Sequence, residues 1–173
     1  YAIWDSGNPG SAEYSIVPTK PETEHLAVPG EGKKAARLES LEAPLVGFAA
    51  GNIFIGHYIE TTLFPPGAKL DWGTLFTSRP LALKGYFDYT PKVIDKCKSQ
   101  FKDLKGKTDI CQIQVFLTDR TEMYHIDSGN NQFVDLNGDD IIAYGSIESD
   151  VATSTKSGLV NGYEPFTIKL EYR

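Results

Sequence analysis

The stretch that decides the fold is Leu75-Phe76-Thr77-Ser78-Arg79-Pro80-Leu81-Ala82-Leu83-Lys84-Gly85-Tyr86-Phe87-Asp88-Tyr89-Thr90-Pro91. It predicts two short strands that meet at Arg79-Pro80. In the second strand two sets of residues alternate: Leu81, Leu83, Gly85, Phe87 and Tyr89 on one side, and Ala82, Lys84, Tyr86, Asp88 and Thr90 on the other. Such alternation is typical of a strand with one buried face, and Pro91 ends the strand because proline cannot donate a ladder hydrogen bond. The polar face is either a surface on which a sugar ring stacks or a half-buried face whose aromatic residue packs.

The rest of the chain shows further short strand patterns. They cover residues 13–17, 26–28, 34–41, 47–58, 110–118, 141–147 and 166–172, and residues 120–126 are expected to return as the hairpin partner of 110–118. Helix is the rival prediction for residues 34–41, and residues 93–101 are the best helix candidate. Many short strands separated by turn signals, with almost no helix, predict an all-β, antiparallel sandwich or barrel.

Length and charge set limits on domain number and partners. The 173 residues fit a single domain over residues 1–173. The 17 Lys and Arg and 23 Asp and Glu residues are scattered and give a net charge of −6, whereas binding to a nucleic-acid backbone needs clustered basic residues. The longest apolar run, residues 44–56, is interrupted by Gly and Asn and is shorter than the roughly 18 residues of a membrane span. The chain begins at Tyr1 and its one methionine is Met123, so we expect a trimmed product without its signal peptide.

Two cysteines, Cys97 and Cys111, flank a polar, lysine-rich segment. In an oxidising compartment they would close this loop as a disulfide, which stabilises by about 3 kcal/mol in the chain-entropy model. In a reducing compartment they would be ordinary thiols. The sequence leaves both readings open, because it does not show whether the two Cα atoms are close enough. With no histidine beside them, they do not form a zinc site.

Sugar recognition by a β-sandwich needs flat apolar faces and planar polar groups. Trp72, next to Asp71 in an expected glycine-flanked turn, is the best placed aromatic residue, and Trp4 is similar. Tyr86, Asp88 and Arg79 would add hydrogen bonds. The structural alternatives are that Trp4 plugs one end of the sandwich and that Arg79 ties loops together.

The segment Asp135-Leu136-Asn137-Gly138-Asp139-Asp140 places oxygen ligands at alternate positions. It is not an EF-hand, because Asp140 stands where the sixth-position glycine belongs and Ser146 where the twelfth-position glutamate belongs. One reading is a single structural calcium held by Asp135, Asn137, Asp139 and Asp140. The other is a loop whose side chains bond to their own backbone.

Five islands in order carry a family resemblance. They are residues 4–10 (WDSGNPG), 49–56 (AAGNIFIG), 76–80 (FTSRP) leading into 85–91 (GYFDYTP), 141–145 (IIAYG) and 163–166 (YEPF). In this order the chain resembles the putative carbohydrate metabolism domain of polysaccharide-foraging Gram-negative bacteria. The resemblance implies a jelly-roll β-sandwich like that of carbohydrate-binding modules. It also implies export to the outer membrane, cell surface or periplasm, often as the C-terminal part of a surface lipoprotein whose lipid anchor lies outside this chain. It supplies no catalytic residue.

The function predicted from these observations is non-catalytic binding of a poly- or oligosaccharide in a surface glycan-utilisation system, with other surface proteins as further partners. The first alternative is a small glycan hydrolase or lyase, for which Asp71 and Asp88 are the first carboxylate pair to inspect. The second is a structural or adhesive module that contacts another surface protein. The three histidines, His25, His57 and His125, lack metal spacing, and His57 is expected in the core.

Overall fold

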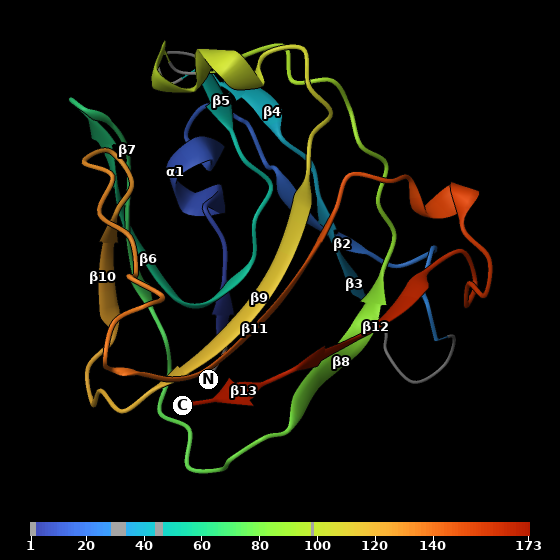
Figure 1. Cartoon of the computed structure of the whole chain (residues 1–173). Coiled ribbons are helices and arrows are strands. Elements are labelled where there is room, and N and C mark those ends of the chain that lie inside the picture. The colour runs from blue at the N-terminus through green and yellow to red at the C-terminus, as the bar shows by residue number, and fades with distance from the viewer. Residues whose placement is uncertain (1–2, 29–33, 44–46, 98) are drawn as a thin grey trace. The chain divides into compact units, whose positions relative to one another are not determined.

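The computed structural model describes residues 3–28, 34–43, 47–97 and 99–173 (Figure 1). The described chain is built mainly of short antiparallel strands, with one five-residue α-helix and two short 3-10 helices. This confirms the predicted all-β class. No helix of the described residues is long and apolar enough to cross a membrane.

The chain forms two compact units. Unit 1 consists of Tyr1–Glu24, Lys33–Thr77 and Arg120–Asn137, and unit 2 of His25–Gly32, Ser78–Asp119 and Gly138–Arg173. Each unit is therefore assembled from segments that are far apart in the sequence. The two units are described separately below.

Unit 1 contains a four-stranded antiparallel sheet. Its strand order is β1 (Trp4–Asp5), β6 (Phe54–Leu63), β7 (Pro66–Trp72) and β10 (Tyr124–Asp127). The unit also contains α1 (Asn8–Ala12) and two strand pairs, β2 (Thr19–Glu22) with β3 (Ala35–Leu38) and β4 (Leu41–Ala43) with β5 (Gly47–Ala49).

Close backbone packing brings β6 and β7 together. Gly56 lies opposite Trp72 with φ +140°, and a Cβ at this position would lie 1.9 Å from the backbone oxygen of Asp71. Glycine is therefore required here for both conformation and space. The strand register directs Tyr58, Leu70 and Ile126 to the inner face, where Ile126 is buried.

Unit 2 contains a three-stranded antiparallel sheet in the order β13 (Glu171–Tyr172), β11 (Ile141–Ser149), β9 (Cys111–Thr118), and a two-stranded ribbon of β12 (Glu164–Lys169) with β8 (Ala82–Phe87). The 3-10 helices η1 (Ser99–Leu104) and η2 (Thr153–Thr155) lie between strands. Buried apolar side chains come from β11, β12 and the residues beside them: Ile141, Ala143, Tyr163, Ile168 and Leu170.

A buried threonine fixes the end of β8. Thr153 is fully buried, and its Oγ1 accepts a hydrogen bond from the backbone N–H of Tyr89 at 2.7 Å. The N–H of Thr153 donates in return to the Tyr89 carbonyl at 2.9 Å. Together the two bonds satisfy polar groups that burial would otherwise leave unpaired.

Several predicted elements differ in the structure. The first of the two strands predicted around Arg79-Pro80 is absent: residues 73–81 are irregular, and the side chains of Leu75 and Phe76 are exposed rather than packed in a core. The predicted strands at residues 13–17 and 26–28 are also irregular. The run at 47–58 is divided into β5 and β6. Between them the backbone carbonyl of Asn52 accepts from the Thr19 hydroxyl at 2.6 Å, and the N–H of Asn52 donates to the same hydroxyl at 3.3 Å, so neither group joins a strand ladder.

The predicted hairpin and helix are also wrong. Strand β10 pairs with β7, and β9 pairs instead with β11, whose register with it extends from Ile141 to Ser149. The predicted helix at 93–101 is replaced by a β-bridge between Val93 and Thr108 and by η1. Here non-local backbone pairing overrides local helix propensity.

Candidate functional site

The exposed face of β8 carries the polar and aromatic side chains that the alternation predicts. Lys84 and Tyr86 of β8 and Asp88, which directly follows the strand, are exposed, whereas Leu83, Gly85 and Phe87 are half-buried. Tyr86 has 44% of its surface exposed and lies opposite Pro165, which is exposed on the same side of the ribbon. Position 85 of β8 favours glycine, because a Cβ on Gly85 would lie 2.7 Å from the ring of Phe166.

The carboxylate of Asp88 is held by a histidine from a distant segment. His25 Nε2 lies 3.2 Å from Asp88 Oδ2. The His25 ring stacks on Tyr163, with ring centroids 4.6 Å apart and planes at 24°, and the Tyr163 hydroxyl donates to the His25 carbonyl at 2.7 Å. The backbone nearby is tied as well, since Asn161 Nδ2 donates to the Ala27 carbonyl at 2.9 Å. The polar end of this face is therefore preorganised.

We call this surface the β8 face and define it by Lys84, Tyr86, Asp88 and His25. Alternate residues of a strand are about 6.5–7 Å apart, which is close to the width of a sugar ring. A ligand on the Tyr86 ring would therefore meet Asp88 and His25 at one edge and the Lys84 ammonium at the other. This arrangement can combine stacking with planar hydrogen bonding.

A second polar surface lies in unit 1, on the outer face of β6, β7 and β10. Asp71 is 18% exposed at its side chain, and its Oδ1 lies 2.5 Å from Nδ1 of His125. Lys69 donates to Glu60 at 2.7 Å, and this hydrogen bond raises the pKa of Lys69 above its usual value. His57 is exposed next to Asp71 in the register, which corrects its predicted place in the core. His57 lies on the outer face of β6, whereas its neighbour Tyr58 lies on the inner face.

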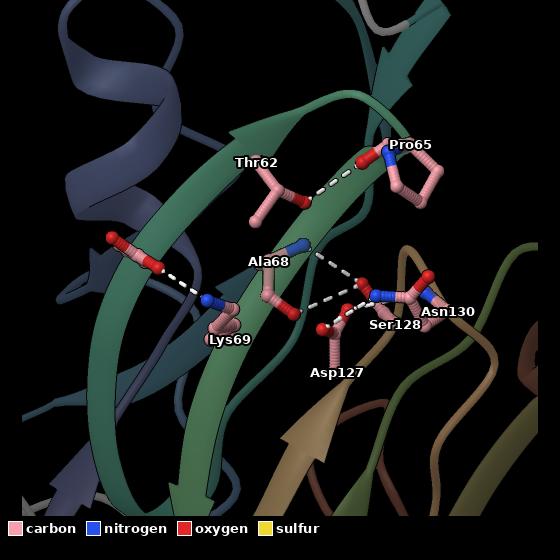
Figure 2. A network of polar contacts seen from close by, with 8 residues as sticks. Thr62, Pro65, Ala68, Lys69, Asp127, Ser128 and Asn130 are labelled. Carbon is pink, nitrogen blue, oxygen red and sulfur yellow. Dashed lines mark hydrogen bonds and ion pairs between the residues drawn. The ribbon is translucent and has the colours of Figure 1, made fainter.

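The turn after β10 is joined to β7 by a polar network (Figure 2). The N–H of Ala68 donates to Ser128 Oγ at 2.8 Å, and that hydroxyl donates back to the Ala68 carbonyl at 3.2 Å. Asp127 accepts from the side chain of Asn130 at 2.9 Å and from its N–H at 3.1 Å, and these bonds lower the pKa of Asp127.

The two tryptophans differ in exposure. Trp72 is the last residue of β7 rather than part of a turn, and its half-buried ring lies 6.1 Å from that of Phe54. Trp72 Nε1 is buried and has no hydrogen-bond partner among the described residues. Trp4, in β1, is more than half exposed. The premise that a glycine-flanked turn presents Trp72 is thus wrong, because the strand extends to that residue.

Arg79 is exposed, and its guanidinium stacks on the ring of Tyr172 with 4.5 Å to the centroid. This contact agrees with the structural alternative for Arg79, in which it ties loops together. The two carboxylates considered as a hydrolytic pair, Asp71 and Asp88, belong to different units, and each is paired with a histidine.

The predicted calcium residues are also divided between the units. Asp135 and Asn137 belong to unit 1, where Asp135 Oδ1 accepts from the Asn137 N–H at 2.9 Å, and Asp139 and Asp140 belong to unit 2. Within the ranges that the structure describes, no three His, Cys, Asp or Glu side chains are grouped so as to hold a metal. Binding of a calcium ion by Asp135, Asn137, Asp139 and Asp140 stays a prediction.

Cys97 and Cys111 are separate free thiols in the structure rather than a disulfide. Both are half-buried, and burial raises the pKa of Cys111.

Sequence reasoning missed the partners that complete both polar surfaces. His25 and Tyr163 were not connected with Asp88, and His125 was not connected with Asp71. The pairs are separated by 63 and 54 positions, so no local pattern joins them. Only the register of β7 with β10 could have revealed the second pair.

Comparison with known proteins identifies the family. Residues 1–173 match the family described as "Putative carbohydrate metabolism domain", so the chain belongs to that family. No curated protein and no solved structure matches the chain.

Proposed function

We propose that this member of the putative carbohydrate metabolism domain family binds carbohydrate on the β8 face and performs no chemistry there. The observation that carries the proposal is the placement of the exposed Tyr86 ring beside the Asp88–His25 pair on one strand face. Sugar sites need an apolar plane together with a few fixed polar groups, and this face offers both. The family name, which refers to carbohydrate metabolism, supports the same class of ligand.

Preorganisation supports binding at this face. Ordering a flexible polar side chain on binding costs about 0.5–1.5 kcal/mol. Stacking on Tyr163 already orders His25, and His25 in turn holds Asp88. A sugar would thus meet groups that are already oriented.

The hydrolase alternative finds less support. A glycosidase acid needs a carboxyl whose pKa is raised so that it stays protonated, and it needs a second carboxylate across the sugar. The pair considered for this role, Asp71 and Asp88, belongs to two different units, and each carboxylate is already paired with a histidine.

One observation favours the adhesive alternative. Phe64, at the turn between β6 and β7, is 96% exposed, and its neighbour Leu63 is also exposed. Aromatic side chains in such positions commonly anchor protein contacts. If Phe64→Ser abolished retention of the chain on a cell surface while sugar binding persisted, that role would stand beside the proposed one.

The cellular setting proposed for the chain is an exported surface glycan-utilisation system, in which residues 1–173 act as one carbohydrate-binding module of jelly-roll type. The ordered sequence islands support this proposal, because they resemble a family of exported proteins. The sugar itself would be a poly- or oligosaccharide.

The proposal is tested by affinity electrophoresis of the purified chain in gels that contain different polysaccharides. Wild type should be retarded by at least one of them, and Tyr86→Ala should migrate freely. The matched control is Phe101→Ala, which removes a similarly exposed ring of unit 2 away from β8. If no polysaccharide retards the wild type, or if Tyr86→Ala is retarded like the control, the proposed site is wrong.

A further inference from the structure

The outer face of β6, β7 and β10 holds two rows of polar side chains that the proposed function does not use. The register places His57, Asp71 and His125 in one cross-strand row, and Glu60, Lys69 and Asp127 in the next. Residues 69 and 71 of β7 are two positions apart, so both rows face the same side. Basic and acidic residue types alternate along each row.

A groove of about 350 Å³ lies over these rows. The register shift between Tyr58 and Glu60 places an extra residue, Ile59, on this face, where it is 52% exposed and lines the groove. The remaining lining residues are Lys69, Leu70, Asp71, His125, Ile126, Asp127 and Gln132. The volume lies at the lower end for ligand sites and suits a small ring with one apolar side.

The acidic and basic groups of the groove already have partners within the protein. Lys69 is paired with Glu60 at 2.7 Å, and Asp71 is paired with His125 at 2.5 Å. Asp127 accepts two hydrogen bonds from Asn130, which stabilise its ionised form. An anion would have to displace a carboxylate from Lys69 or His125, and it would also meet the ionised carboxylate of Asp127. A neutral ligand has neither cost.

The side chains of His125 and Gln132 can form hydrogen bonds with the hydroxyls of a sugar. Because Nδ1 of His125 is used by Asp71, Nε2 is the ring nitrogen available to a ligand, and the imidazole is 82% exposed at its side chain. Two backbone hydrogen bonds, of 2.9 and 3.0 Å, join Gln132 to Asp127 and hold the amide side chain of Gln132 at the rim. Hydroxyls both donate and accept, as these groups require.

Polar contacts beside the groove join the elements that carry its lining residues. Figure 2 shows Ser128 bridging the N–H and the carbonyl of Ala68, so that the end of β10 is attached to β7. Thr62 Oγ1 donates to the Pro65 carbonyl at 2.9 Å across the β6–β7 turn. These contacts limit the rearrangement that binding would require.

From these observations we infer that the groove is a second saccharide site, distinct from the β8 face, and that it accepts a neutral sugar unit in preference to an acidic one. The inference rests on the proposed function for the class of ligand and deepens it by adding a site and its charge preference. A glycan of uronic acids would place a carboxylate against Asp71 or Asp127. Neutral hexose or pentose units would not.

The experiment is a residue-resolved NMR titration of the ¹⁵N-labelled full chain. The probes are neutral tetrasaccharides (cello-, xylo-, manno- and arabino-oligosaccharides) and tetragalacturonate. We expect at least one neutral probe to shift the backbone amides of Leu70, Asp71 and Ile126, and tetragalacturonate to shift them at least tenfold more weakly. Equal or stronger shifts with tetragalacturonate would overturn the charge preference.

Variants separate this site from its surroundings. Asp71→Asn should weaken the groove response at least fivefold, and His125→Ala provides a second variant if the first does not fold. His57→Ala is the matched control, because His57 lies in the same row but does not line the groove. If His57→Ala weakens the response as strongly as Asp71→Asn, the effect does not depend on lining the groove, and the groove assignment is wrong.

The same spectra distinguish failure of this inference from failure of the proposed function. If the amides of the groove do not shift while those of Tyr86 and Asp88 do, the second site alone is overturned. Shifts in the groove together with silence on β8 support the second site and contradict the β8 face. Silence at both positions overturns both.

Discussion

His25 Nε2 lies 3.2 Å from the carboxylate of Asp88, although 63 positions separate these residues. The pair brings a loop residue to the exposed face of β8 and fixes the carboxylate next to Tyr86. Stacking on the ring of Tyr163 holds the His25 imidazole in this position. The polar half of the proposed sugar site thus depends on a contact that only the folded chain creates.

The first prediction concerns this contact. His25→Ala leaves Tyr86 in place but frees Asp88 to adopt several rotamers. Ordering one such side chain costs about 0.5–1.5 kcal/mol, which corresponds to a roughly twofold to tenfold loss of glycan affinity. Isothermal titration calorimetry measures the change, with His57→Ala as the control histidine. Wild-type affinity in His25→Ala would show that the pair does not position the site.

The second prediction concerns the buried hydroxyl at the end of β8. Thr153→Val keeps the shape of the side chain but leaves the N–H of Tyr89 without its acceptor. A buried unsatisfied donor costs about 1–3 kcal/mol. Denaturant unfolding should show a loss of this size for Thr153→Val and a smaller one for Thr153→Ser, which keeps the hydroxyl. Equal losses in the two variants would argue that methyl packing matters more than the bond.

The third prediction concerns the β6–β7 contact. Gly56→Ala should destabilise unit 1 by about 3 kcal/mol or more, because its Cβ would meet the backbone of Asp71. Gly47→Ala is the control, since Gly47 also has positive φ, at +90°, but has nothing within 4 Å of its Cβ position. The control should lose only about 1 kcal/mol from backbone strain. Similar losses measured by thermal unfolding would remove the clash from the explanation.

The fourth prediction is a dependence on pH. Burial, followed by the nearby carboxylate of Asp109, raises the pKa of Tyr89 above its usual value. The folded state therefore keeps the Tyr89 proton at a pH where the unfolded chain, with a pKa of about 10, has lost it. Its contribution to stability is complete below about pH 10 and decreases as the pH rises above that value.

Tyr89→Phe removes this titration, so the variant should lose stability less steeply than wild type between about pH 9.5 and 11. Denaturant unfolding at several pH values measures the two slopes. Parallel slopes would contradict the assignment.

The fold class could be predicted because alternation is a local property. The alternation at residues 81–90 predicted strand β8 and its exposed Lys84 and Tyr86, but the strand ends at Phe87, and Leu81, expected on the buried face, is exposed. Residues 110–118 predicted β9 in the same way. The pairing of β10 with β7 rather than with β9 could not be predicted, because partner choice depends on non-local packing. The strand predicted before Arg79-Pro80 could not be tested locally, and those residues are irregular because no strand pairs with them in the described chain.

The candidate sites were only half predictable, for the same reason. Tyr86 and Asp88 follow from one strand, so their common face was visible in the sequence. Their partners His25 and Tyr163 come from other segments, and the match between Asp71 and His125 depends on the register of two strands. Trp72 was misjudged because flanking glycine indicated a turn, whereas β7 continues to that residue.

The central claim, that the β8 face binds carbohydrate, is tested most directly by calorimetric titration of three chains with a polysaccharide that retards the wild type. Tyr86→Ala should lose at least tenfold in affinity, because the apolar plane is removed, and Tyr86→Phe should stay within about threefold, because the plane is kept. All three should show the same thermal unfolding midpoint within about 2 °C. Wild-type affinity in Tyr86→Ala, or equal losses in the two variants, would contradict stacking on Tyr86.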